Sequence, residues 1–339
     1  MARCGPVWMA LLLEAAIGSA AAARAQVGTA GESEETAAAE GGARGGKARE
    51  IGWPEAYPDV RIAEMVAAPV LVTTAFVLFT VPEPPEPELG AGNAFDRELQ
   101  EAFSVRSATY QKAAAITGHA GFYGSMVYRA FDAGVMAGAV RGSWELAWRL
   151  AVIDAMAFGL VGSVVWGSQM FVERQRPKDV YCATDPTYEA ETRDCAEDST
   201  GANRSFISGH VATAVAGASL TCLHHARFPI YERPWGKRAC ATHAVAAGVV
   251  GAMRSTGDDH WPTDILLGVA LGMVAGWVLP RALHYGWDHY GFGEEVRETE
   301  AEGDEGAEAR RGGWDGRPRV FLAPWASHEQ GGARLIGMF

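Results

Sequence analysis

Three apolar stretches, each with a long uncharged run, constrain the fold of this chain more than any other feature. Each is long enough for a helix, and they are Val66–Val81, Trp144–Val172 and Ile265–Pro280. The first has sixteen residues and no charge, and a helix of that length spans about 24 Å, slightly less than a typical bilayer core. Such side chains must be buried in protein or in lipid, so the sequence predicts an all-α fold.

Reactive side chains gather directly before the last apolar stretch. Residues 253–264 read M-R-S-T-G-D-D-H-W-P-T-D and place Arg254, His260 and Asp264 at spacings of six and four. If a helix begins near Pro262, Asp264 can hold one ring nitrogen of His260, which makes the other nitrogen a better nucleophile or base. Arg254 adds a planar cation suited to phosphate oxygens. The alternative is an N-capping aspartate beside a surface histidine and arginine.

A second stretch, residues 203–210, reads N-R-S-F-I-S-G-H and opens a run of small apolar residues. Ser208 is a natural N-cap, and Gly209 lets backbone amides approach a ligand closely. A helix N-terminus of this sort binds anions through its free amides and the helix dipole. His210, one step inside the helix, could donate a proton to a leaving oxygen.

A third stretch, residues 169–177, reads Q-M-F-V-E-R-Q-R-P at the end of a long apolar segment. A helix is expected to stop at Arg176-Pro177, because the residue before a proline disfavours the helical conformation. Gln169 precedes Arg176 by seven residues, or two helical turns, which predicts that both side chains lie on one helix face.

Together the three stretches resemble the three-part signature of the type 2 phosphatidic acid phosphatase superfamily, which also holds bacterial class A acid phosphatases and vanadium haloperoxidases. The matching residues are Arg176-Pro177, Ser208-Gly209-His210 and Arg254…His260…Asp264. The resemblance covers residues 169–268, near a third of the chain, and implies a helical bundle of about six core helices. Two positions depart from the pattern: Gln169 replaces a lysine and Ile207 replaces a proline.

The resemblance also implies a mechanism. His260 attacks phosphorus and forms a phosphohistidine, Asp264 orients His260, and His210 protonates the leaving group. The residues expected to hold the phosphate oxygens are Arg176, Arg254, Ser208, the Gly209 amide and, in the lysine's place, Gln169. Preorganised cations and amides of this kind can stabilise the developing charge without a metal.

Three functional hypotheses follow. The first is a metal-independent phosphatase without a cofactor, acting on phosphorylated lipids or small phosphate esters, including pyrophosphates. The second is a vanadate-dependent haloperoxidase, since vanadate mimics the phosphoryl transition state. The third is a non-catalytic relative that binds phosphate without turnover, because the amide of Gln169 can hydrogen-bond to phosphate but brings no charge. A formal net charge of −12 without a basic stripe argues against nucleic acid as a partner.

Composition divides the rest of the chain. Residues 1–25 are expected to be a secretory signal peptide, with the alternative of an alanine-rich tail, and residues 26–60 a disordered linker. The catalytic helical domain is expected at 61–290 and an acidic linker at 291–316. Residues 317–339 are predicted to form a β-hairpin, with strands at Arg319–Ala323 and Ala333–Phe339 around a turn that contains Gly332.

Cysteines bear on the compartment. Cys182 and Cys195 lie in a polar segment, Glu173–Arg204, and a disulfide between them is expected, with free thiols as the alternative. Cys222 and Cys240 flank a basic loop. Thiols there would stay reduced if that loop is cytoplasmic, in line with the positive-inside rule, and would be oxidised if the whole domain is periplasmic.

Placement in the cell envelope has two solutions. The favoured one is an inner-membrane protein whose site faces the periplasm, and the alternative is a soluble periplasmic bundle. A cleaved signal would require an even number of spans before Arg176, but three apolar segments precede it. Either Ile116–Val140, which follows a predicted helix at Phe95–Ala115, does not span, or residues 1–25 are not an export signal; the soluble bundle has no spans. Thr117-Gly118-His119 echoes Ser208-Gly209-His210 but lacks a matching partner set, and we interpret it as coincidence.

Overall fold

The fold is known from a computed structural model that describes residues 50–82, 92–188, 195 and 203–287, together with the backbone of residues 319–326 and 331–338. The signal peptide, most of the disordered segment and the acidic linker predicted from the sequence lie outside these residues. The predicted linker, however, ends earlier than expected. Ile51 and Trp53 pack against the core, and the Ile51 amide donates a 2.6 Å hydrogen bond to Ser143 Oγ.

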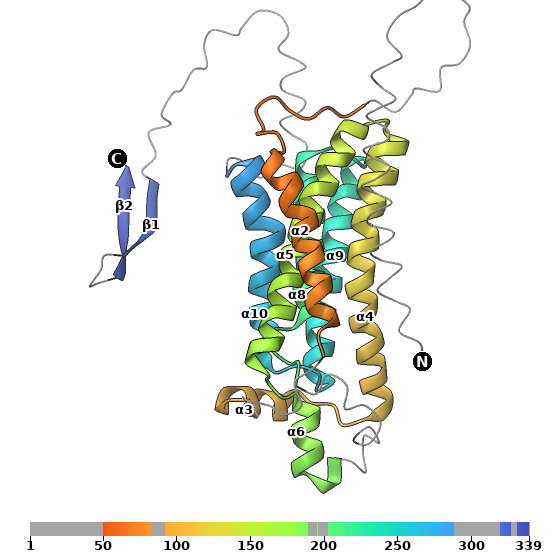
Figure 1. Cartoon of the computed structure of the whole chain (residues 1–339), viewed down its shortest axis with the longest axis vertical. Helices are drawn as coiled ribbons and strands as arrows, with labels where there is room; N and C mark the ends of the chain where they lie inside the picture. Colours follow the sequence, from red (N-terminus) through yellow and green to blue (C-terminus); the bar gives the residue numbers. More distant parts are fainter. Residues whose placement is uncertain are drawn as a thin grey trace, which may run out of the picture. The chain divides into compact units, whose positions relative to one another are not determined.

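Six long helices form a bundle, as the sequence predicts (Figure 1). They are α2 (Ile62–Thr80), α4 (Ala108–Phe131), α5 (Trp144–Val172), α8 (Gly209–Arg227), α9 (Arg233–Thr256) and α10 (Pro262–Met273). Helix α4 continues into the π-helical segment η1 (Asp132–Val140), and α10 continues through η2 (Val274–Val278) to η3 (Arg281–Tyr285). Two short helices, α3 (Ala94–Phe103) and α6 (Pro177–Thr184), lie at one end of the bundle (Figure 1).

That end, which we call the site end, is where α2, α5 and α9 finish and where α4, α8 and α10 begin. The opposite end, where α8 finishes, is called the far end. Glycines allow α10 and its continuation η2 to pack closely against α8. An added Cβ on Gly268, Gly272 or Gly276 would overlap backbone atoms of α8 or of Ser208, the residue before it. Small residues at spacings of four allow close helix packing, and here the packing sets the start of α8 beside the start of α10.

Two of the predicted helix boundaries are wrong. The predicted single helix at Phe95–Ala115 is broken after Phe103, because Ser104 Oγ donates to Asp258 and the Val105 amide donates to the Thr256 carbonyl. Residues 116–140, expected as a separate apolar segment, instead continue α4 into η1. Helix α6 lies within the segment that the sequence analysis assigned as a polar loop.

Gln169 and Arg176 could share one helix face only if α5 continued to Arg176, but α5 ends earlier. Its last residue is Val172, and Glu173 takes a left-handed conformation with φ of 45°. Arg176 is extended and caps the start of α6. The prediction that Gln169 and Arg176 share one helix face is therefore wrong, and a turn of the chain brings Arg176 to the site end instead.

Among the described residues, three helices are long and apolar enough to cross a membrane: Ile62–Thr80, Trp144–Val172 and Pro262–Tyr285. Apolar side chains of α2 point away from the protein, and Ile62, Val66 and Val70 are 76%, 57% and 56% exposed. A continuous apolar surface of this kind is suited to lipid. These features are those of a membrane protein.

Two disulfides are present, one at each end of the bundle. Cys182, on α6 at the site end, pairs with Cys195. Cys222 and Cys240 join α8 to α9; Cys222 lies fourteen residues after Ser208, or about 21 Å along a helix, and so near the far end. Residues 294–339 form a separate unit.

In that unit, β1 (Arg319–Ala326) and β2 (Gly331–Met338) pair as an antiparallel hairpin. The strands are longer than the sequence predicts. Gly332, which was expected in the turn, lies in β2 and pairs with Trp325. The prediction that Gly332 lies in the turn is therefore wrong.

Candidate active site

The three sequence motifs meet at the site end. Arg176 precedes α6, Ser208 precedes α8, Arg254 lies in the last turn of α9, and His260 lies between α9 and α10. Backbone contacts join these elements: the Ser208 amide donates to the Asp264 carbonyl at 3.2 Å. Arg176 and Asp264, which are 88 positions apart in the sequence, are thus brought to the same end of the bundle.

His260 is buried, with 1% of its surface exposed, and a hydrogen bond from one ring nitrogen holds the ring in place. Nδ1 lies 2.7 Å from the Ser205 carbonyl oxygen, to which it can only donate. Burial lowers the pKa of His260 well below its ordinary value, and the nearby charges of Arg254 and Arg176 lower it further. The ring is therefore neutral at pH 7, with the proton on Nδ1 and the lone pair on Nε2.

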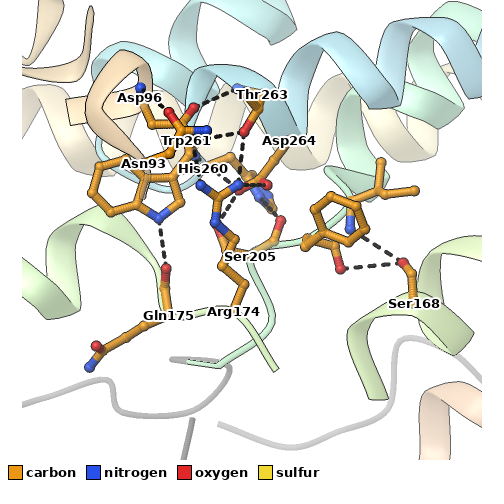
Figure 2. A network of polar contacts seen from close by, with 12 residues as sticks. Asn93, Asp96, Ser168, Arg174, Gln175, Ser205, His260, Trp261, Thr263 and Asp264 are labelled. Atoms are coloured by element: carbon orange, nitrogen blue, oxygen red, sulfur yellow. Dashed lines mark hydrogen bonds and ion pairs between the residues drawn. The ribbon is translucent and has the colours of Figure 1, made fainter. Parts of the chain in front are cut away.

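The prediction that Asp264 holds His260 directly is wrong. Its Oδ2 accepts hydrogen bonds from Ser205 Oγ at 2.6 Å and from the Trp261 amide at 3.1 Å, as Figure 2 shows. Asp264 lies in the first turn of α10, so its carboxylate folds back onto the amide at the start of its own helix. It reaches His260 only through Ser205, whose hydroxyl it binds and whose carbonyl holds the ring.

Arg174 is the partner of Asp264 that the sequence analysis missed. Its Nη1 donates to Asp264 Oδ1 at 2.6 Å and to Thr263 Oγ1 at 2.8 Å. Its Nη2 pairs with Asp96 of α3, and its guanidinium lies over the Trp261 ring (Figure 2). Arg174 thereby ties α3, α10 and the turn after α5 together. No spacing in the sequence distinguishes it from Arg176, two residues later.

Two arginines and one carboxylate occupy the centre of the site. Arg254 is 2% exposed; burial lowers its pKa to about 10, while Asp259 raises it and Arg176 lowers it further. Asp259 Oδ2 lies 2.8 Å from Arg254 Nη1, and Asp259 Oδ1 lies 3.7 Å from Arg176 Nη1. Asp259 was not singled out from the sequence.

Several buried polar atoms here have no hydrogen-bond partner. They are Ser208 Oγ, Gln169 Oε1, Arg176 Nε and Arg254 Nε. Buried polar groups are normally paired, and a group of unpaired ones marks a place for a ligand or solvent. Three of the four are donors, which suits an anion. All four residues are ones that the sequence predicts to bind phosphate.

Ser208 and Gly209 form the start of α8. Ser208 is fully buried and takes the N-cap position, but its hydroxyl does not cap the helix. The first amides of α8 therefore remain available to an anion. Gln169, by contrast, uses its Nε2 to donate a 3.0 Å hydrogen bond to the Ile207 carbonyl, and so holds the segment that leads into Ser208.

His210 lies one residue inside α8, and burial lowers its pKa well below the ordinary value, with contributions from Arg254, His119 and Arg176. The interpretation of Thr117-Gly118-His119 as unrelated to the site does not hold. The His119 ring lies 5.0 Å from the His210 ring in an edge-on contact. A Cβ on Gly118 would come 2.8 Å from Arg254 Cδ, so α4 forms one wall of the site.

Asp258 holds the turn that carries Asp259 and His260. It has φ of 60°, and its carboxylate accepts hydrogen bonds from Gln100 and Ser104 at 2.7 and 2.8 Å. Tyr188 donates a further bond at 2.8 Å. Burial raises the pKa of Asp258, and these hydrogen bonds oppose the rise. This anchor is another residue that the motif spacing did not indicate.

The fold and the site thus define a helical membrane protein with an anion site lined by arginine and histidine. The family model of the PAP2 superfamily matches residues 147–288, which include all three motifs. The resemblance drawn from the motifs is therefore confirmed over this part of the chain.

Two similar proteins give further context. The chain is 30% identical over 128 residues to a lipid A 1-phosphatase from Porphyromonas gingivalis; the match covers 38% of this chain and only 22% of that protein, about a fifth of its length. A crystal structure of a transmembrane PAP2-type phosphatidylglycerolphosphate phosphatase from Bacillus subtilis is 17% identical, with a TM-score of 0.43, over 65% of this chain and 94% of that one.

Proposed function

We propose that this protein is a phosphatase that hydrolyses phosphomonoesters or pyrophosphates, with lipid phosphates as its substrates, through a phosphohistidine at His260. The observation that carries the proposal is the state of His260. Its ring is neutral, its Nδ1 is held by Ser205, and two arginines and His210 lie close by. A neutral imidazole with one nitrogen fixed has its other nitrogen free to attack phosphorus.

In the first step, Nε2 of His260 forms a bond to phosphorus as the bond to the leaving oxygen breaks. Burial lowers the pKa of His210, but the negative charge of a bound phosphate favours its protonated form. In that form His210 gives its proton to the leaving oxygen, and the alcohol or phosphate leaves. In the second step, water attacks phosphorus and returns a proton to His210, while the bond between phosphorus and His260 breaks. The products are inorganic phosphate and the dephosphorylated lipid.

Charge on the transferred phosphoryl group is stabilised by fixed groups of the protein. Arg176 and Arg254 supply positive charge, and Ser208 with the amides at the start of α8 supplies hydrogen-bond donors. Donors that are already in place stabilise a transition state without reorganising. Gln169 takes the position of the family's lysine, so the site works with two cationic side chains there. No metal is required by this mechanism.

Lipid phosphates are the substrate class that the surroundings of the site support. The relative in Porphyromonas gingivalis is named for a lipid phosphate, and α2, α5 and α10 carry apolar surface toward the site end. The Cys182–Cys195 disulfide on α6 supports a site that faces an oxidising compartment, the periplasm. This placement keeps the substrate phosphate at the membrane surface.

The proposal is tested by phosphate release from the purified full chain in detergent, with EDTA present, across lipid phosphates and soluble phosphate esters. We expect His260→Ala to abolish release. His243→Ala is the matched control. The Nδ1 of His243 lies 2.8 Å from the Ala239 carbonyl oxygen, much as that of His260 lies 2.7 Å from Ser205, but His243 is on α9 beside Tyr128. Undiminished release by His260→Ala would refute the mechanism.

A further inference from the structure

Asp259, the residue before His260, occupies the position between the two arginines of the site. Its two carboxylate oxygens lie 2.8 Å from Arg254 and 3.7 Å from Arg176. The side chains of Asp259 and Arg254 are 10% and 3% exposed, so water and salt screen their attraction only weakly. One carboxylate of the protein therefore contacts both cations that the proposed function assigns to the substrate phosphate.

The backbone of this turn is fixed, so the carboxylate can move only by rotation of its own side chain. The Asp259 amide donates to the Arg254 carbonyl at 3.2 Å, and the Lys178 amide donates to the Asp258 carbonyl at 3.0 Å. The Asp258 side chain is anchored by Gln100, Ser104 and Tyr188. Asp259 is thus held at the arginine pair by the structure around it.

A phosphate and the Asp259 carboxylate cannot both occupy this position. Guanidinium groups bind carboxylates and phosphates with the same donor geometry. Two anions on one pair of cations would repel each other strongly in a site that excludes water. With the neutral Gln169 in the lysine's place, two arginines and one aspartate leave a single net positive charge for an incoming anion.

We propose that Asp259 is an internal competitor for phosphate, which sets what the site will bind. Its carboxylate pairs with Arg176 and Arg254 when the site is empty, turns aside when a phosphate ester binds, and returns to displace inorganic phosphate after hydrolysis. Free phosphate then binds weakly, and a substrate gains its affinity from the group that carries the phosphate. This inference rests on the proposed function for the identity of the anion.

The test compares inorganic phosphate and orthovanadate binding by the wild-type full chain and by Asp259→Asn, both in detergent and followed by calorimetry. The asparagine keeps the size and one acceptor oxygen but removes the charge. We expect it to bind both anions at least about ten-fold more tightly, within the range of coupling measured between close charge pairs. Inhibition of turnover by phosphate should strengthen by the same factor.

Two controls separate charge from shape and from general effects. Asp259→Glu retains the carboxylate, and we expect its affinity for phosphate to stay near that of the wild type. Asp185→Asn removes the carboxylate of a different ion pair, in which Asp185 lies 2.8 Å from Arg106 and both side chains are partly exposed. This variant should leave phosphate binding unchanged. If Asp259→Asn does not fold, Asp259→Ser gives the same neutral comparison.

The outcome is distinguishable from failure of the proposed function, because anion affinity is measured without turnover. Tighter phosphate binding by the folded Asp259→Asn variant supports the inference even if the wild type hydrolyses nothing. Unchanged or weaker binding by that variant overturns it, even if His260-dependent hydrolysis is observed.

Discussion

At the scale of single residues, the pH dependence of turnover should report the burial of His260. The attacking form is the neutral ring, and burial with nearby arginines lowers its pKa below the ordinary value of 6.5. Protonation therefore removes activity only below that pH. We expect the midpoint of the acid limb of kcat/KM, corrected for the second ionisation of the substrate, to lie below pH 6.5. A limb at or above 6.5 would contradict this assignment.

His119 should affect the opposite limb. His210 must be protonated to act as the acid, and the neighbouring His119 is one of the charges that lower the pKa of His210. Removing that charge raises the pKa of His210, so the basic limb of kcat should move to higher pH in His119→Ala. His243→Ala serves as the control and should leave the limb in place. If kcat has the same pH profile in the wild type, His119→Ala and His243→Ala, then His119 does not act on His210.

Arg174 should prove more important for stability than any residue of the sequence motifs. It pairs with Asp264 and Asp96, and both carboxylates are fully buried. Breaking a buried pair leaves a charge without a partner and costs about 3–5 kcal/mol. We expect Arg174→Ala to lower the melting temperature sharply. Glu145→Gln, on a carboxylate that is 64% exposed, should change it little, and similar shifts for the two variants would count against this role.

At the scale of helices, the contact between α8 and α10 should set the geometry of the site. A side chain at Gly272 would overlap the Ala212 carbonyl, so Gly272→Ala must push the helices apart. Overpacking of this kind costs about 1–3 kcal/mol, and it should also lower kcat, because Ser208 and His260 flank the starts of these helices.

Gly248→Ala is the matched control for that substitution. Gly248 lies within α9, and a Cβ there meets nothing within 4 Å. Alanine favours a helix over glycine by about 0.5–1 kcal/mol, so this variant should be as stable as the wild type or more so. If Gly272→Ala behaves in the same way, the close approach of α8 and α10 does not position the site.

The helices also show what could be read from the sequence and what could not. Helix α5 was predicted with its observed bounds, Trp144–Val172, because its composition alone requires burial. The break between α3 and α4 was missed, since it depends on contacts of Ser104 and Val105 with residues some 150 positions away. Local sequence carries no trace of such contacts.

The same distinction holds in the site. Motif spacing singled out His260, His210, Arg176 and Arg254 by their chemistry, and the structure brings them to the site end. It assigned Asp264 the wrong partner, since the choice between His260 and Ser205 depends on where residue 205 lies in space. Arg174 and Asp259 escaped notice for the same reason: a single charged side chain acquires its role from distant partners.

At the scale of the whole molecule, the two disulfides bear on how the bundle sits in the cell envelope. Cys182–Cys195 lies at the site end and Cys222–Cys240 near the far end. A bundle that crosses the inner membrane with its site in the periplasm would expose the far end to the cytoplasm. Thiols in that compartment are kept reduced, whereas the structure pairs both sets of cysteines.

Thiol alkylation in intact and in lysed cells measures this directly. We expect Cys182 and Cys195, at the site end, to resist alkylation until a reductant is added. Protection of Cys222 and Cys240 as well would place both ends of the bundle outside the cytoplasm and favour the periplasmic alternative. Alkylation of Cys222 and Cys240 while Cys182 and Cys195 stay protected would instead show a bundle that crosses the inner membrane, with the basic loop between α8 and α9 on the cytoplasmic side.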